Sequence, residues 1–187
     1  MMYQFHTITK ISDSDIEPVS LTDMKNWMRV RDNSDDTLIT NLITSARRHI
    51  EKLTGVALTN QKFKVILETS GSNKNIWVVD LPYSSNDCTP IVRLKNWIND
   101  YTTLTKNTDY EVIGGKLFLY SQAIYDVEYD CGYGQVPDDL ISDIMTLVAW
   151  SYENRGKKMI GDAKSGLLLQ YPDWNGLNYH QYVKNVI

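Results

Sequence analysis

The residues whose chemistry could support catalysis are few and scattered along this sequence. The three histidines are His6, His49 and His180, and the chain contains no HExxH motif, no zinc-finger cysteine pair and no calcium-loop pattern. Asp138 and Asp139 are adjacent, so on a helix their side chains point in different directions and cannot bracket a scissile bond. We therefore predict no catalytic residue, no metal site, no cofactor and no enzymatic activity.

A glycine turn, Gly132-Tyr133-Gly134, precedes a predicted helix and is the nearest approach to a phosphate-binding loop. Backbone N–H groups at a helix N-terminus can hold an anion. This turn lacks the third glycine of a dinucleotide-binding fingerprint and the Lys-Ser/Thr pair of a P-loop. Asp138 and Asp139 would also repel an anion at this place, so we expect a structural turn.

One basic cluster, Arg155, Lys157, Lys158 and Lys164, follows the last long helical segment. Positive charge at the end of a helix compensates the helix dipole, and we favour this interpretation. The alternative is that Arg155, Lys157 and Lys158 contact an acidic partner or DNA phosphates. The two interpretations remain open at this point.

The composition indicates one domain, or one domain with an insertion, in a chain of 187 residues of which 42% are hydrophobic. The net charge of -4 argues against a protein that coats nucleic acid, but not against one that DNA passes. Cys88 and Cys131 lack a ligand spacing, which is typical of thiols in a reducing cytoplasm; a disulfide between them is the less favoured alternative. No apolar run is long enough to span a bilayer, so we expect no membrane contact.

The segment from 136 to 156 predicts one long helix, with Pro137 in its first turn and Gly156 as its stop. Two apolar stripes run along it, and a helix with so wide an apolar arc usually packs against more than one neighbour. Asp143 belongs to the remaining, polar side. The residues expected to pack in the core or in a ring contact are Leu140, Ile144, Met145, Leu147, Val148 and Tyr152.

Two further helices are predicted in the N-terminal part of the chain. Ser20 and Asp23 resemble a capping box at the start of a short helix. A longer helix is predicted from Asp35 to Gly55, and the repeat of its apolar residues is helical. Its charged residues are expected to face outward: Arg47, Arg48, Glu51 and Lys52.

Between residues 60 and 130 the apolar repeat changes to two, which predicts five or six short strands. Gly114-Gly115 lies between two apolar runs and predicts a hairpin with a two-residue turn. Residues 1–19 indicate an extended arm or an edge strand, with a flexible tail as the alternative.

The segment from 157 to 187 is rich in aromatic residues although it has no regular repeat. A disordered tail would contain fewer aromatic residues. We therefore predict that it docks, either on its own domain or on a partner. The residues expected to dock are Leu167, Leu168, Leu169, Tyr171, Trp174, Tyr179 and Tyr182.

These predictions combine into an α+β fold. Two N-terminal helices and one long C-terminal helix, within residues 20–59 and 131–156, form the helical core. A small antiparallel β domain, residues 60–130, is inserted between them. Residues 1–19 form an N-terminal arm, and residues 157–187 form an extended C-terminal docking segment.

Several blocks of this sequence resemble the head–tail connector (adaptor) proteins of tailed bacteriophages, in the long form with a β-rich insertion. VSLTDMKNWMRV at 19–30 is similar to the opening of these proteins, and the acidic run at 32–36 follows as it does in them. Residues 46–55 match the end of their next helix. Residues 136–140 and YENRG at 152–156 match the start and the end of their closing helix.

The resemblance covers residues 19–60 and 125–156, and it implies a structural protein of the virion. Connector proteins form a ring of about a dozen copies beneath the portal, in the neck between capsid and tail, after assembly in the host cytoplasm. Their C-terminal segment commonly docks into the portal, and a stopper or tail-completion protein binds the opposite face. DNA passes through the ring without sequence-specific binding.

A rival hypothesis is a ligand- or glycan-binding β module of a phage tail, with the helices as a scaffold. It predicts that Trp77, Trp97 and Tyr101 are exposed together on one face of the sheet.

Overall fold

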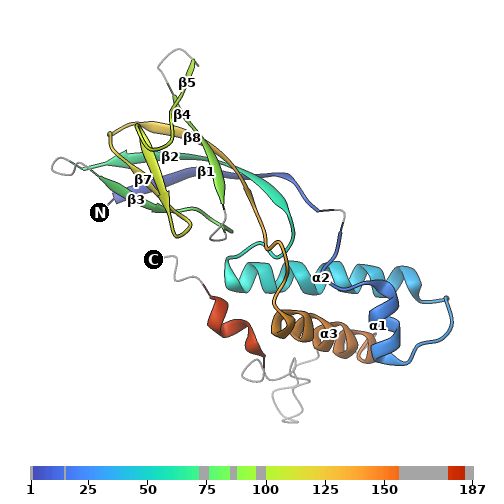
Figure 1. The fold of residues 1–187 in the computed structure, drawn as a ribbon. Coiled ribbons are helices and arrows are strands. Elements are labelled where there is room, and N and C mark those ends of the chain that lie inside the picture. The colour runs from blue at the N-terminus through green and yellow to red at the C-terminus, as the bar shows by residue number, and fades with distance from the viewer. Residues whose placement is uncertain are drawn as a thin grey trace, which may run out of the picture. The chain divides into compact units, whose positions relative to one another are not determined.

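The computed structural model describes most of the chain (Figure 1), namely residues 2–14, 16–71, 76–84, 88–95, 100–155 and 177–183. The chain forms two compact units. The β unit takes its described residues from 2–16 and 55–135, and the helical unit takes its described residues from 17–54 and 136–183. The predicted α+β fold is confirmed, with three α-helices and two antiparallel sheets in the described residues.

The β unit consists of a five-stranded and a three-stranded sheet. The larger sheet has the order β1 (Met2–Ser12), β2 (Gln61–Ser70), β8 (Ile124–Cys131), β4 (Thr89–Lys95) and β5 (Tyr101–Thr103). The smaller sheet has the order β3 (Trp77–Asp80), β7 (Lys116–Leu119) and β6 (Tyr110–Ile113). The N-terminal residues form the edge strand β1, and sequence reasoning missed the short strand β5.

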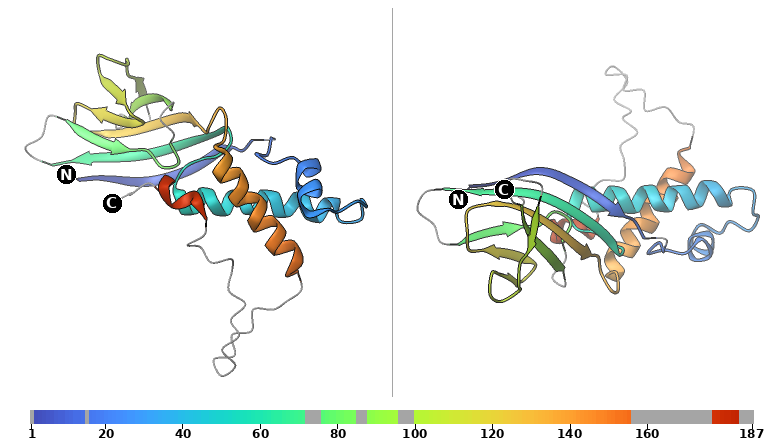
Figure 2. Two further views of the ribbon diagram at one scale, coloured as in Figure 1. Left: turned by 60° about the horizontal axis from the view of Figure 1, so that its bottom comes forward. Right: turned by 90° about the horizontal axis from the view of Figure 1, so that it is seen from above.

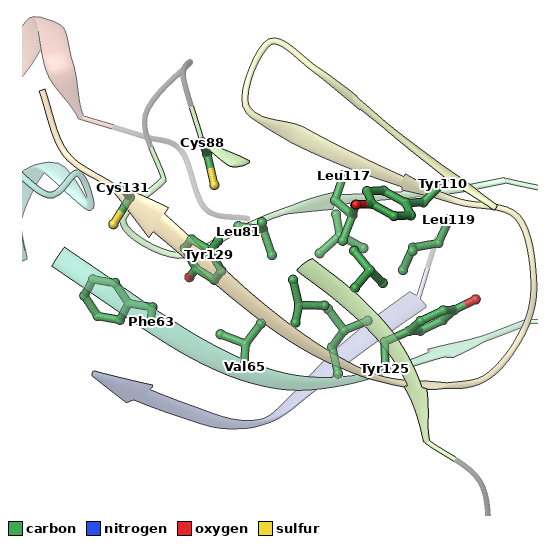
Figure 3. Close-up of a cluster of buried hydrophobic side chains, with 14 of the residues drawn as sticks. Phe63, Val65, Leu81, Cys88, Tyr110, Leu117, Leu119, Tyr125, Tyr129 and Cys131 are labelled. Carbon is green, nitrogen blue, oxygen red and sulfur yellow. The ribbon is translucent and has the colours of Figure 1, made fainter. Parts of the chain in front are cut away.

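The core of the β unit is built from alternate residues of its strands. In β2 every second residue is buried, including Phe63, Val65 and Leu67. Val127 of β8 lies opposite Val65, so the two strands bury the same face. Figure 3 shows side chains from both sheets meeting in this cluster, together with the buried thiols of Cys88 and Cys131.

Much of the aromatic content of the chain serves this core. Tyr110, Tyr125 and Tyr129 are buried there, as is Trp77. Each tyrosine hydroxyl donates to a backbone carbonyl oxygen, for example from Tyr129 to Pro82 at 2.6 Å and from Tyr110 to Pro90 at 2.9 Å. Burial raises the pKa of Tyr129. These hydrogen bonds allow large aromatic side chains to be buried without an unsatisfied polar tip.

Three glycines, a pair in a turn and one after β8, adopt backbone geometry that other residues rarely adopt. Gly114 and Gly115 have φ of 58° and 74° and connect β6 to β7, which confirms the predicted two-residue hairpin. Gly132 has φ of 132°, and a Cβ atom placed on it would lie 2.4 Å from the carbonyl oxygen of Thr59. The chain leaving β8 therefore passes directly against the chain entering β2.

The helical unit contains α1 (Leu21–Met28), α2 (Asp36–Thr54), α3 (Asp138–Glu153) and the short 3-10 helix η2 (Asn178–Tyr182). Ser20 caps α1, because its hydroxyl accepts from the backbone N–H of Asp23 at 3.0 Å and donates to the Asp23 carboxylate at 2.6 Å. Figure 2 shows that α3 lies across α2 and that η2 lies beside α3. The buried apolar residues of the three α-helices are Met24, Ile39, Ile43, Ala46, Ile50, Leu140, Ile144, Leu147 and Val148.

Two of the outward-facing residues predicted for α2 are in fact buried. Arg47 is 1% exposed and Glu51 is 4% exposed. The Nε atom of Arg47 lies 2.7 Å from Glu17, and its Nη1 atom lies 3.1 Å from Glu51. Glu17, 30 residues away in the sequence, supplies the second carboxylate that makes burial of the guanidinium tolerable.

Replacing Gly132 with alanine is expected to destabilise the protein by about 2–6 kcal/mol, because the strained φ and the clash with Thr59 each cost about 1–3 kcal/mol. Gly134→Ala is the matched control, since nothing lies within 4 Å of a Cβ atom there. Urea unfolding followed by circular dichroism measures both variants. Equal stability of the two variants would show that this crossing of the chain is not tight.

Arg47→Ala is expected to cost about 3–5 kcal/mol of stability, because it leaves the buried Glu51 carboxylate without its cation. Lys52→Ala changes an exposed residue of the same helix and should lie within about 0.5 kcal/mol of the parent protein. Thermal and urea unfolding of both variants tests this. A stable Arg47→Ala protein would contradict the buried ion pair.

Candidate functional site

The closing helix α3 carries the residues that the sequence singled out for packing or assembly. Leu140, Ile144, Leu147 and Val148 are at most 3% exposed and form the face of α3 that packs in the helical unit. Met145 and Tyr152 are only half-buried. These four residues therefore belong to the core of the helical unit, whereas Met145 and Tyr152 keep part of their surface exposed.

Asp143, which the sequence pattern places on the polar side of α3 away from the two apolar stripes, is only 2% exposed. Its carboxylate accepts hydrogen bonds from the backbone N–H of Asn178 at 2.8 Å and from the Asn178 side chain at 3.3 Å. Leu177, the preceding residue, is buried at 8% exposure. The C-terminal turn covers Asp143, and the local pattern of α3 does not reveal that contact.

Asp139 forms a second attachment of the same turn. Its carboxylate accepts from the Tyr182 hydroxyl at 3.0 and 2.9 Å and from the side-chain amide of Gln181. We call residues 177–183 and their contacts with Asp139 and Asp143 the C-terminal clasp. The clasp explains why two acidic residues lie one turn apart in the first half of α3.

The clasp also shows where part of the predicted docking segment lies. Tyr182 contacts α3 of its own chain, and Tyr179 lies in η2, although its side chain is outside the described residues. The other predicted docking residues, and the two lysines that follow α3, also lie outside the described residues: Leu167, Leu168, Leu169, Tyr171, Trp174, Lys157 and Lys158.

The other end of α3 is tied to the loop before α2. The Tyr152 hydroxyl donates to Asp35 at 2.6 Å, and Arg155 lies 3.4 Å from the same carboxylate oxygen. The Arg155 guanidinium also lies 4.1 Å from the centre of the Tyr152 ring. Tyr152 and Arg155 of the YENRG block thus both hold the end of α3. The side chain of Arg155 nevertheless remains 51% exposed.

His49 lines a cavity of about 70 Å³ between α2 and α3, together with Leu42, Ser45, Ala46, Leu147 and Ser151. Burial lowers the pKa of His49, and the nearby charge of Lys52 lowers it further. The imidazole is therefore neutral at pH 7. The volume suffices for a water molecule or two and excludes a substrate.

A group of four charged residues lies across β2, β8 and β4. Lys64 is 2.8 Å from the buried Asp126, and Arg93 is 2.8 Å from Glu128. The hydrogen bond from Arg93 lowers the pKa of Glu128, and the charges of Arg93 and Lys64 act in the same direction. Two cations balance two carboxylates, so this cluster leaves no net charge to attract a metal or an anion.

A hollow of about 490 Å³ opens at one end of the larger sheet. Its lining is Ser12, Asn60, Gln61, Thr89, Asp130, Cys131, Gly132 and Gly134. Among these described lining residues, Asp130 is the one carboxylate and none is basic. Within the described ranges, no three histidine, cysteine or carboxylate side chains are grouped as metal ligands. No helix built from the described residues has the length and hydropathy to cross a bilayer.

The sequence model of the phage gp6-like head–tail connector protein family matches residues 18–79, which cover α1, α2 and β2 and reach into β3. This match confirms the resemblance to head–tail connector proteins. No curated protein sequence is significantly similar to the chain.

Seven chains of solved structures match the chain, and three of them come from gene transfer agent particles. A chain from the neck of an empty gene transfer agent (GTA) particle, computed with C6 symmetry, has a TM-score of 0.70 and 13% identity, with 97% of each chain covered. A chain from the native GTA virion has a TM-score of 0.64 and 14% identity, covering 80% of this chain and 86% of that chain. A chain from the native GTA neck, computed with C12 symmetry, has a TM-score of 0.57 and 17% identity over 80% and 84%.

Replacing both Asp139 and Asp143 with alanine is expected to release the C-terminal clasp, because the hydrogen bonds of Asn178 and Tyr182 are lost. Amide hydrogen exchange of a peptide covering 177–183 should then become faster by about tenfold or more, which corresponds to at least about 1.4 kcal/mol. Asp138→Ala removes an exposed charge from the same turn and should leave the exchange unchanged. Unchanged protection in the double variant would show that the aspartates do not hold the segment.

Proposed function

We propose that this chain is a structural subunit of the neck of a tailed-phage-like particle, where it forms a ring between head and tail. The observation that carries the proposal is the agreement of two independent similarities. The connector family model matches the N-terminal helices, and the fold is shared over 97% of the length of a GTA neck chain. The symmetric neck and virion assemblies in which the similar chains occur support a repeated, ring-forming subunit.

The composition of the described sites supports a structural rather than an enzymatic role. Ionisable groups of the described residues are used in the buried Arg47 pair, the C-terminal clasp and the balanced charge cluster around Asp126. A net charge of -4 suits a channel wall past which DNA slides, because a basic wall would bind phosphates and release counterions.

In this proposal, the portal protein binds one face of the ring and a stopper or tail-completion protein binds the other. The portal-docking element is the segment that contains Leu167–Leu169, Tyr171 and Trp174. It is connected to the helical unit at both ends, at Arg155 and at Leu177. The half-buried stripe of α3, which includes Met145, is a surface for a neighbouring copy.

The basic residues after α3 have unequal roles in this proposal. Arg155 is paired with Asp35, so part of its charge is compensated within the subunit. Lys157 and Lys158 are the residues that we assign to an acidic partner or to DNA phosphates.

The rival hypothesis of a glycan-binding module loses support from the position of Trp77. Its side chain belongs to the core and is only 4% exposed. Tyr101 is 40% exposed, and Trp97 lies outside the described residues. Trp77 is therefore not available on the surface of the β unit to bind a carbohydrate.

Replacing Leu167, Leu168 and Leu169 together with serine is expected to weaken binding to the portal ring by at least about tenfold, because an apolar anchor is lost. Binding is measured by electron microscopy and by sedimentation of the protein mixed with its portal ring. Ile113→Ser, which changes a residue that is 58% exposed in the β unit, serves as the control. Added ring density with the parent protein supports the adaptor role, and its absence would contradict it. Normal binding by the triple variant would contradict only the docking assignment.

A further inference from the structure

Trp27 is a large apolar side chain on the surface of the helical unit. It lies in the last turn of α1 and is 55% exposed, whereas Met24 of the same helix is fully buried. Tryptophan is enriched at the centres of protein interfaces, where it supplies much of the binding energy. More than half of this side chain is uncovered in the subunit, so its surface is available to another molecule.

Two arginines follow Trp27 within four residues, and both are exposed. Arg29 ends α1 with a left-handed backbone at φ 59°, where glycine or asparagine is the usual residue. The end of the helix therefore gives no reason for an arginine side chain at this position. Within the described part of the chain, neither Arg29 nor Arg31 has an ion-pair partner, whereas Lys25 of α1 lies 2.6 Å from Asp36.

One side of α3 carries the opposite charge. Residues three or four positions apart lie on the same side of a helix. On the side of α3 that faces away from its buried residues, such a row is formed by Asp138, Ser142, Met145, Ala149 and Glu153, which we call the outer stripe. Asp138 and Glu153 are exposed, and neither has a cationic partner among the described residues. Met145 and Ala149, between them, are half-buried.

We propose that Trp27 of one copy packs on the outer stripe of the next copy, over Met145 and Ala149, with Glu153 beside Arg29 and Arg31. This inference rests on the proposed ring, and it names the surface that the half-buried side of α3 meets. Ala149 and Glu153 are one helical turn apart, about 6 Å, so both arginines can reach the carboxylate when the indole lies on Ala149.

The contact joins two different surfaces of the chain, the end of α1 and the outer stripe of α3. A contact of this kind repeats from copy to copy and can close a ring, whereas a contact between identical surfaces produces a two-fold pair. Each copy in a complete ring therefore uses both surfaces once.

The charges favour a second copy over DNA as the partner. Asp23 and Asp32 are exposed on either side of Trp27 and the arginines, and they would repel phosphate groups. The outer stripe instead supplies a single carboxylate next to an apolar and a small side chain. The arginines and Glu153 each lack an ion-pair partner in the described part of their own chain, and each copy offers the charge that its neighbour lacks.

The proposed contact is small, and this has a consequence for assembly. It contains one tryptophan and an exposed ion pair, and exposed ion pairs contribute little free energy. Two isolated subunits are therefore expected to remain monomeric. Several copies held on one portal ring gain effective concentration, and the same contact can then join neighbours.

The first test replaces Trp27 with alanine in the full-length protein. Ring occupancy on the portal, measured by electron microscopy and sedimentation, should fall by about tenfold or more. The melting temperature of the isolated subunit should not change. Leu53→Ala, at a residue of α2 that is 37% exposed, is the control and should assemble normally. Full rings of the Trp27→Ala protein would overturn the inference, as would a lower melting temperature, which would show that Trp27 serves its own fold.

The second test exchanges the charges. Arg29→Glu combined with Arg31→Glu should reduce ring occupancy by about tenfold, because both residues then repel Glu153 of the neighbour. Adding Glu153→Arg should restore assembly, since each chain carries both halves of the contact. Adding Asp138→Arg instead should not restore it, because Asp138 lies about 22 Å from Glu153 along the same stripe.

Failure of Glu153→Arg to restore assembly would overturn the inference and would indicate that the arginines contact the portal or DNA. Restoration by Asp138→Arg alone would overturn it as well. These outcomes leave the proposed function intact as long as the parent protein forms rings. A parent protein that forms no ring on the portal would contradict the proposed function itself.

Discussion

The helical unit depends on the burial of one face of α3 against α2, although strands β2 to β8 separate the two helices in the sequence. For the two helices to pack, the residues between them must begin and end close to each other. β2 and β8 meet that requirement because they are antiparallel neighbours, with Gln61 opposite Cys131. The backbone at Gly132 then passes against Thr59 at a distance that excludes any side chain. A single glycine therefore permits an insertion of this size within a helical framework.

The elements and their faces could be predicted from the sequence because they follow from local patterns. Each of these patterns is contained within about ten residues. The alternation in β2 predicts a strand, the glycine pair before β7 predicts a hairpin, and the apolar stripe of α3 predicts a helix. Arg47 and Asp143 could not be placed in this way. Their partners are Glu17 and Asn178, which lie 30 and 35 residues away, and an isolated helix pattern assigns both charges to solvent. β5 was missed because three residues are too few to show a repeat.

The sequence predicted that a C-terminal segment docks, but it did not predict which residues that segment contacts. The sequence indicated that the segment after α3 docks on its own domain or on a partner. The described residues 177–183 dock on their own helix, through Leu177 and two aspartates. Tyr152 and Arg155 were chosen for packing and charge, and both converge on Asp35. The acidic loop that leads into α2 therefore also holds the C-terminal end of α3, through Asp35.

The C-terminal clasp also affects how such a protein can diverge. Arg155 and Leu177 are both held by the helical unit, so the residues between them begin and end on a fixed support. The contacts that hold these two ends are made by Arg155 and Asn178, which lie outside residues 156–176, so changes in that stretch leave the contacting residues in place. This part of the gene can therefore be exchanged as a cassette, and a lineage could acquire a new binding partner by recombination while the framework is inherited unchanged.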